Sequence, residues 1–226
     1  KTLSWAVAGI DPAKNLAQQA NRAGIPTLCD FWNRKTARRM ADEFGEPDVI
    51  TATNVFAHND DAHEFVAAAK SVLRPGGELI VEVPYLPIML HDGTFDLVYH
   101  EHYSYYALAP VVRLMQEHGL EVSRADIVPI HGGSLRFSAC APNGHQGHVG
   151  VRELLEDEKR NGLDTAAPYE DFAQRAAATR DALIDLVRGE AARGRVVGYG
   201  APAKATVLVN YCGFTAKDIE YIVDDN

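Results

Sequence analysis

A ten-residue stretch from Tyr99 to Leu108, YHEHYSYYAL, contains two histidines, one glutamate and four tyrosines. Solvated surfaces favour lysine and glutamate, and buried cores favour leucine and valine. The mixture fits neither environment and predicts a functional site. Histidine suits general base catalysis near neutral pH, and a neighbouring glutamate can fix its tautomer and raise its basicity.

The conformation of this stretch decides which side chains act together. In an extended segment, Tyr99, Glu101 and Tyr103 face one side, and His100 and His102 face the other. In a helical turn, Tyr99 and His102 share a face. A polar loop with exposed aromatics is an alternative, and the His-x-His spacing leaves metal binding as a rival. No other Cys/His cluster supports a metal site, and we predict none.

Polar residues also follow several predicted strands. Asp11 ends the apolar run WAVAGI, where doubly wound folds often place a carboxylate that binds a ribose diol. Asn54 and His58, in TNVFAHNDD, fall where a later strand ends. Ligands bind outside the carboxyl ends of parallel strands, so both are candidates. A turn-capping aspartate and a structural histidine are the alternatives.

Two glycine-containing loops offer groups for anions. The turn HGGSLR presents backbone N–H groups, Ser134 and Arg136, which can meet a phosphate or a sugar, although it also reads as an ordinary hairpin. The loop in VVGYGAPAKAT joins a strand to a helix start and contains Gly200 and Lys204. It provides N–H groups, a helix dipole and a cation, so we expect a diphosphate. It lacks a Walker A ending, so ATPase activity is not implied.

The elements that must position these residues alternate between strand and helix. KNLAQQANRAG, TARRMADEFG and DDAHEFVAAAKSVL read as helices, the last with Asp60 or Asp61 as N-cap. Between and after them, WAVAGID, IPTLCDF, PDVITATNVFAH and ELIVEVPY read as strands. This order predicts βαβ units and an α/β fold with a Rossmann-like, mostly parallel sheet.

The second half of the chain departs from this alternation. We predict an irregular insertion after Tyr85, a helix over ALAPVVRLMQEHG, and two antiparallel strands joined by residues 131–134 at one sheet edge. Residues 143–150 are a candidate boundary. A helical stretch follows over about 151–193, and a new strand–loop–helix–strand unit follows that.

The composition excludes several classes of protein. The 226 residues are 46% hydrophobic and 23% charged, with a net charge of −9 and no basic run, which argues against nucleic-acid binding. No apolar run is long enough to span a membrane, and we expect no signal peptide. Three scattered cysteines suit a reducing, cytoplasmic location rather than disulfides or a zinc site. The oligomeric state cannot be read from the sequence.

Six motifs together resemble the nucleotide-sugar C-methyltransferases, a group of class I methyltransferases. They are GIDPAKNLA, NVFAHNDD, LRPGGELIVEVPYL, FDLVYHEHYSYYAL, HGGSLR and GYGAPAKATVLVNYCG, which span nearly the whole chain. The resemblance implies methylation of a ring carbon of a dTDP-linked ketosugar, with S-adenosylmethionine as cofactor and an enolate formed by a base.

The resemblance also implies roles for individual residues. His102 would be the base, with Glu101 as its orienting or alternate partner. Tyr99 and His58 would hydrogen-bond the keto or enolate oxygen.

Other residues would hold the two ligands. Asp11 would bind the cofactor ribose, Asp30 would approach the adenine, and Asn54 would belong to the cofactor site. Lys204 and the backbone near Gly200 would face the sugar-nucleotide diphosphate.

Family members also have an N-terminal zinc-binding module, a first strand with a glycine-rich loop, and a longer C-terminal domain. We therefore expect the sequence to be a fragment at both ends, with zinc only in the missing module. The predicted parts are a methyltransferase domain (1–145), a helical connector (146–193) and the start of an α/β sugar-nucleotide-binding domain (194–226).

Two rival functions remain open from the sequence. One is an O- or N-methyltransferase on the same fold, which needs no acidic C–H bond in its substrate. The other is a non-catalytic module that binds sugar nucleotides, which the missing glycine-rich loop favours.

Overall fold

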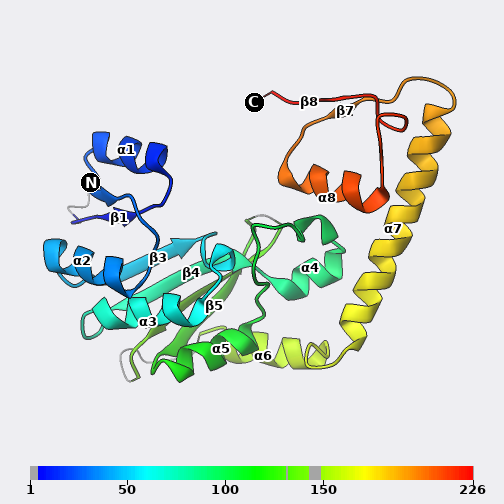
Figure 1. The fold of residues 1–226 in the computed structure, drawn as a ribbon. Helices are drawn as coiled ribbons and strands as arrows, with labels where there is room; N and C mark the ends of the chain where they lie inside the picture. Colours follow the sequence, from blue (N-terminus) through cyan, green and yellow to red (C-terminus); the bar gives the residue numbers. More distant parts are fainter. Residues whose placement is uncertain (1–4, 131, 143–148, 226) are drawn as a thin grey trace.

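The computed structural model describes residues 5–130, 132–142 and 149–225 of the chain. Strands and helices alternate through its first half (Figure 1). These are β1 (Gly9–Ile10), α1 (Lys14–Arg22), β2 (Thr27–Leu28), α2 (Arg34–Phe44), β3 (Val49–Thr53), the 3₁₀ helix η1 (Phe56–His58), α3 (Ala62–Val72) and β4 (Glu78–Pro84). The rest contains α4 (Leu86–Asp92), the 3₁₀ helix η2 (Phe95–Leu97), α5 (Leu108–Glu117), β5 (Glu121–Val128), β6 (Ser134–Cys140), α6 (Val151–Arg160), α7 (Ala167–Ala191), β7 (Gly198–Tyr199), α8 (Ala203–Cys212) and β8 (Ile222–Val223).

The main sheet has the strand order β3-β4-β6-β5. Strands β3 and β4 are parallel, whereas β6 is antiparallel to both β4 and β5. Two further parallel pairs form, β1 with β2 and β7 with β8. Three of the five pairings between these described strands are therefore parallel, and the predicted α/β class is confirmed. The predicted antiparallel pair is also present, with β5 at the sheet edge and β6 inside.

The core lies on the face of the main sheet that is covered by α3 and α5 (Figure 1). Alternate residues of the two central strands point into it, as the two-residue period of a strand requires. Leu79, Val81 and Val83 of β4 and Leu135 and Phe137 of β6 are completely buried. Each contributes about 1.5–3 kcal/mol by leaving water, so this face fixes the sheet that positions the site.

Side-chain caps define where α2 and α3 begin. Asp61 accepts a 2.8 Å hydrogen bond from the Glu64 backbone N–H at the start of α3, which confirms one of the two predicted N-caps. Asn33 and Thr36 form a reciprocal capping box at the start of α2. These local bonds satisfy backbone donors that a helix start leaves unpaired.

The segment after Tyr85 differs from the prediction of an irregular insertion, because it contains α4 and η2. Pro87 lies in the first turn of α4, where its missing N–H has no helical partner to lose. Gly93 ends the helix with a left-handed φ of 70°. The proline and the glycine therefore mark the two ends of a short helix rather than a loop.

The predicted helical stretch over 151–193 is confirmed as two helices, α6 and α7. The 25-residue α7 runs from α6, beside the sheet, to the unit formed by β7, α8 and β8 (Figure 1). The predicted boundary at 145/146 lies outside the described residues, and both domain boundaries stay predictions. None of the helices in the described ranges is long and apolar enough to cross a membrane.

Candidate active site

The site is built where η1 meets the segment 99–106. Strand β3 ends at Thr53, and the next residue, Asn54, has a left-handed φ of 55° that turns the chain toward η1. The Phe56 ring is completely buried and stacks on Tyr106, with centroids 4.8 Å apart. The Tyr103 backbone N–H donates to the Ala57 carbonyl at 2.9 Å. Two segments far apart in the sequence are thereby held side by side, and His58 is placed beside His102.

Three aromatic side chains surround the His102 imidazole. The ring centroid of His102 lies 4.3 Å from that of Tyr99, 5.1 Å from that of His58 and 5.7 Å from that of Tyr105. The His102 N–H also donates to the Tyr99 carbonyl at 3.0 Å, so the segment makes a turn. The turn alternative, in which Tyr99 and His102 share a face, is the one observed.

A backbone carbonyl selects the tautomer of His102. The imidazole Nδ1 lies 2.9 Å from the Leu97 carbonyl oxygen, which can only accept. Nδ1 therefore carries the hydrogen, and Nε2 has a free lone pair. The Tyr105 hydroxyl donates to the same carbonyl oxygen at 3.1 Å. The geometry gives His102 the form that a general base requires.

The titratable side chains next to His102 are held in their neutral forms. Burial, followed by the nearby His102, lowers the pKa of His58, so its imidazole stays neutral near pH 7. Burial, followed by the charge of Glu101, raises the pKa of Tyr99, so its phenol stays protonated. Burial also raises the pKa of Tyr105. Tyr99 and His58 can therefore offer hydrogen bonds beside His102.

Glu101 does not take the orienting position that the sequence suggested. The acceptor at Nδ1 of His102 is the Leu97 carbonyl, and the Glu101 side chain is exposed. The turn at residues 99–102 directs consecutive side chains apart, so a carboxylate one residue away does not reach Nδ1. Glu101 acts at longer range: its charge opposes the lowering of the His58 pKa and adds to the rise of the Tyr99 pKa.

Three predicted cofactor residues follow the carboxyl ends of parallel strands. The backbone N–H groups of Asp11 and Asp30 both donate to the Leu28 carbonyl, at 3.0 and 3.1 Å, so these residues lie together after β1 and β2. The Asp11 carboxylate also accepts from Ala13 N–H at 2.8 Å and closes the turn into α1. Asn54 follows β3, and its side-chain oxygen is buried without a hydrogen-bond partner among the described residues.

That unpaired oxygen is the observation that bears on a cofactor site. A buried acceptor without a partner is costly, and few native groups are left in that state. Asn54 also adopts a strained left-handed backbone conformation at the end of a strand. A cofactor with hydroxyl or amine donors would satisfy this oxygen, so the residues present fit such a group.

The turn after β5 has mainly structural contacts. The Ser134 hydroxyl is buried and donates to the Ile130 carbonyl at 2.9 Å. Gly133 has a φ of +132°, which L side chains rarely adopt, and an added Cβ would lie 2.5 Å from the Ile88 side chain, so this position favours glycine. The Arg136 guanidinium donates two bonds, at 2.9 and 2.6 Å, to the buried Glu82 carboxylate. The structure favours the hairpin reading of this turn, and His131 lies outside the described residues.

The second predicted ligand loop joins β7 to α8. Gly200 has a φ of +88°, and its N–H donates to the Val223 carbonyl at 2.7 Å. Lys204 is half-buried in the first turn of α8, and its ammonium forms no hydrogen bond or ion pair with the described part of the chain. A helix start with a free cation suits an anionic ligand.

Sequence reasoning missed the residues that hold together the two ends of the segment between Tyr85 and Leu108. The Glu158 carboxylate, buried on α6, accepts from the Tyr85 hydroxyl at 2.7 Å and from the N–H groups of Leu108 and Ala109 at 2.5 and 2.9 Å. It therefore caps α5 and ties Tyr85, before the loop, to the residues after it. Helix α6 shows as an acidic and basic surface helix in sequence, so no local signal identifies Glu158.

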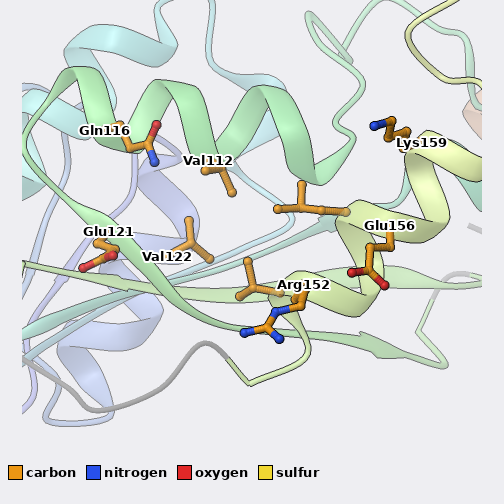
Figure 2. A pocket seen from close by; sticks show the side chains of 9 residues that line it. Val112, Gln116, Glu121, Val122, Arg152, Glu156 and Lys159 are labelled. Carbon is orange, nitrogen blue, oxygen red and sulfur yellow. The ribbon is translucent and has the colours of Figure 1, made fainter.

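One groove lies outside this site. A groove of about 420 Å³ between α5, β5 and α6 is lined by Val112, Val122 and Leu155 and rimmed by Arg152 and Lys159 (Figure 2). It contains none of the predicted site residues. Among the described residues, no three His, Cys, Asp or Glu side chains are grouped so that they could hold a metal ion.

Two family profiles match consecutive parts of the chain. One, described as a methyltransferase domain, matches residues 1–125, and the other, described as the C-methyltransferase C-terminal domain, matches residues 129–226. A curated relative, the C-methyltransferase NovU of Streptomyces niveus, is 36% identical over 220 residues. The match covers 96% of this chain and 52% of that protein, so the chain spans about half the length of this relative.

Solved structures show a more distant likeness. Magnesium protoporphyrin IX methyltransferase from Synechocystis PCC 6803, with bound SAH, has a TM-score of 0.45 at 13% identity over 60% of this chain and 64% of that chain. The complex between the Haloferax volcanii Trm112 methyltransferase activator and a methyltransferase has a TM-score of 0.47 at 15% identity, over 63% and 75% of the two chains. The family profiles, which together span most of the sequence, carry the assignment. The chain therefore belongs to the S-adenosylmethionine-dependent methyltransferase family, in its C-methyltransferase branch.

Proposed function

We propose that the protein methylates a carbon next to the ketone of a nucleotide-linked ketosugar, with His102 as the base. The observation that carries the proposal is the free Nε2 of His102, with Nδ1 held by the Leu97 carbonyl. Tyr99 and His58 lie beside that imidazole as neutral hydrogen-bonding groups. The relative named above as a C-methyltransferase supports the reaction class.

The reaction needs a base because a ring carbon bonded to carbon and hydrogen is not a nucleophile. Nε2 of His102 removes the proton alpha to the ketone, and the electrons of the C–H bond move into an enolate. Tyr99 or His58 donates a hydrogen bond to the developing oxyanion. S-adenosylmethionine, when bound, would supply the electrophilic methyl group to this carbon, with its S–CH3 bond broken and S-adenosylhomocysteine as the leaving group. The His102 imidazolium then releases its proton to water.

Positioning accounts for much of the expected acceleration. Holding two reactants in line can supply up to roughly 7–11 kcal/mol of the barrier. We assign binding of the methyl donor, S-adenosylmethionine, to the Asp11, Asp30 and Asn54 side chains, which follow three strand ends. We assign the substrate diphosphate to the backbone at Gly200 and to Lys204. Since Ser134 and Arg136 are engaged within the protein, they contribute to the substrate site only if a ligand displaces those bonds.

The test uses the full-length protein with S-adenosylmethionine and a nucleotide ketosugar. His102→Ala should lower kcat by about 10²–10⁴-fold, the usual contribution of a general base, while donor binding stays unchanged. The matched control is His100→Ala, an exposed histidine two residues away, which should turn over normally. Unchanged kcat in the His102 variant would remove His102 from this role.

Two further measurements separate the proposal from its rivals. Without the methyl donor, solvent deuterium should enter the alpha position of the ketosugar, more slowly in the His102 variant than in the wild type. Methylation of the corresponding alcohol, with no exchange in the ketone, would indicate an O-methyltransferase. Binding of the methyl donor and the sugar nucleotide, with no methylation of the ketosugar or of the alcohol, would indicate a binding module.

A further inference from the structure

Helix α8 of the C-terminal unit packs against η2, the short turn that precedes the catalytic segment. The Tyr211 ring of α8 lies 5.3 Å from the Phe95 ring of η2, centroid to centroid, at an interplanar angle of 59°. Phe95 is only 9% exposed, so its ring is largely buried with this contact in place. The Arg180 guanidinium of α7 lies 5.3 Å from the Tyr211 ring centroid and holds it by a cation–π contact.

The turn that Tyr211 contacts carries the carbonyl group that orients His102. Phe95 and Leu97 belong to the same 3₁₀ turn, in which Leu97 N–H donates to Thr94 and Val98 N–H donates to Phe95. The Leu97 carbonyl oxygen accepts from His102 Nδ1. Because a 3₁₀ turn of three residues has weak hydrogen bonds of its own, its position depends on how its side chains pack.

Helix α7 makes a second contact, with the end of α4, just before η2. Arg175 of α7 donates to the carbonyl groups of Leu90 and His91, the latter at 3.1 Å, in the last turn of α4. These are carbonyls that a helix end leaves without partners. Gly93 and η2 follow directly. Helices α7 and α8 therefore hold the segment between α4 and the catalytic residues from the C-terminal side.

We propose that Tyr211 is a positioning residue for His102: by packing on Phe95 it fixes the turn whose Leu97 carbonyl keeps the hydrogen on Nδ1 and the lone pair on Nε2. This proposal rests on the function proposed above in one respect, because the expected effect on kcat requires His102 to be the base. The tautomer of an imidazole follows the partner of its other nitrogen. When the turn moves, the acceptor at Nδ1 moves with it.

The experiment observes the His102 tautomer directly by NMR of the full-length protein containing ¹⁵N-labelled histidine, with His102→Asn to assign its signals. The wild type should show hydrogen on Nδ1. Tyr211→Ala should give a measurable population with hydrogen on Nε2 and should lower kcat about tenfold, while KM for the methyl donor stays constant. Tyr211→Phe retains the ring and should retain both properties.

Matched variants separate positioning from general loss of structure. Tyr221→Ala removes an exposed tyrosine of the same unit and should leave tautomer and kcat unchanged. Phe95→Leu removes the other ring of the contact while keeping an apolar side chain, and should reproduce the tautomer change if Tyr211→Ala fails to fold. An unchanged His102 tautomer in Tyr211→Ala and Phe95→Leu would overturn the proposal. A changed tautomer with unchanged kcat would support it and count instead against His102 as the base.

Discussion

The proposed catalytic segment, residues 99–106, and the glycine loop, residues 198–204, are held in different ways. The first is fixed by contacts with Phe56, Ala57 and Leu97, which come from other elements, and its aromatic rings pack closely. The second is mainly exposed, and is held by strand bonds to β8 and by an exposed hydrogen bond from Tyr199 to Asp225. Proton transfer requires a fixed geometry, whereas a charged ligand can be captured by a loop that adjusts to it.

This difference leads to separate expectations for the two regions. Variants of the buried anchors around the catalytic segment should affect stability and kcat together. Variants of the glycine loop should affect substrate binding while the fold remains intact. Three predictions test this contrast, beginning with the largest effect.

Glu158→Ala should have the largest effect on stability. It leaves the N–H groups of Leu108 and Ala109 and the Tyr85 hydroxyl without their buried acceptor, at a cost of about 3 kcal/mol in the free energy of unfolding. Urea unfolding measures this, and the control is Glu156→Ala, an exposed glutamate on the same helix. Equal urea midpoints for the two variants would show that the Glu158 carboxylate does not stabilise the contact between Tyr85 and the start of α5.

Lys204→Ala should weaken substrate binding without changing the fold. Loss of one cation from a partly exposed diphosphate site should raise KM for the nucleotide sugar about tenfold, with kcat almost constant. The effect should shrink at high salt, because salt screens exposed charges. Lys217→Ala, an exposed lysine of the same unit, is the control. An equal rise in KM for both variants, or a loss confined to kcat, would contradict the assignment.

The smallest expected effect is a pH dependence of the free energy of unfolding that comes from His58, beside the segment 99–106. The pKa of His58 is lower in the folded protein than its ordinary value of 6.5, so the unfolded chain binds more protons between these two values. The free energy of unfolding should therefore rise with pH through this range and be constant above it. His58→Gln should reduce the slope, as measured by urea unfolding at several pH values from about 5 to about 7.5. A slope identical to that of the wild type would show that His58 makes no such contribution.

Much of the fold could be predicted because its signals are local. Glycine, aspartate and the hydrophobic period mark α1, α3 and the strands of the main sheet, and the double glycine marks the turn between β5 and β6. Helix α4 was missed, since Pro87 and Gly93 were read as loop residues although they mark a helix start and a helix end. The candidate site was predicted from its composition, which places two histidines and four tyrosines in ten residues.

The sequence by itself determined the alternation of strands and helices before Tyr85, the N-cap of α3 and the chemical groups available between Tyr99 and Leu108. Only the tertiary structure decided which group orients His102 and what holds that group in place. The orienting atom is the backbone oxygen of Leu97, and every residue has such an oxygen, so no residue type reveals it. Its position depends on packing between distant segments, as in the contact of Phe95 with Tyr211, and such packing is fixed only when the chain has folded.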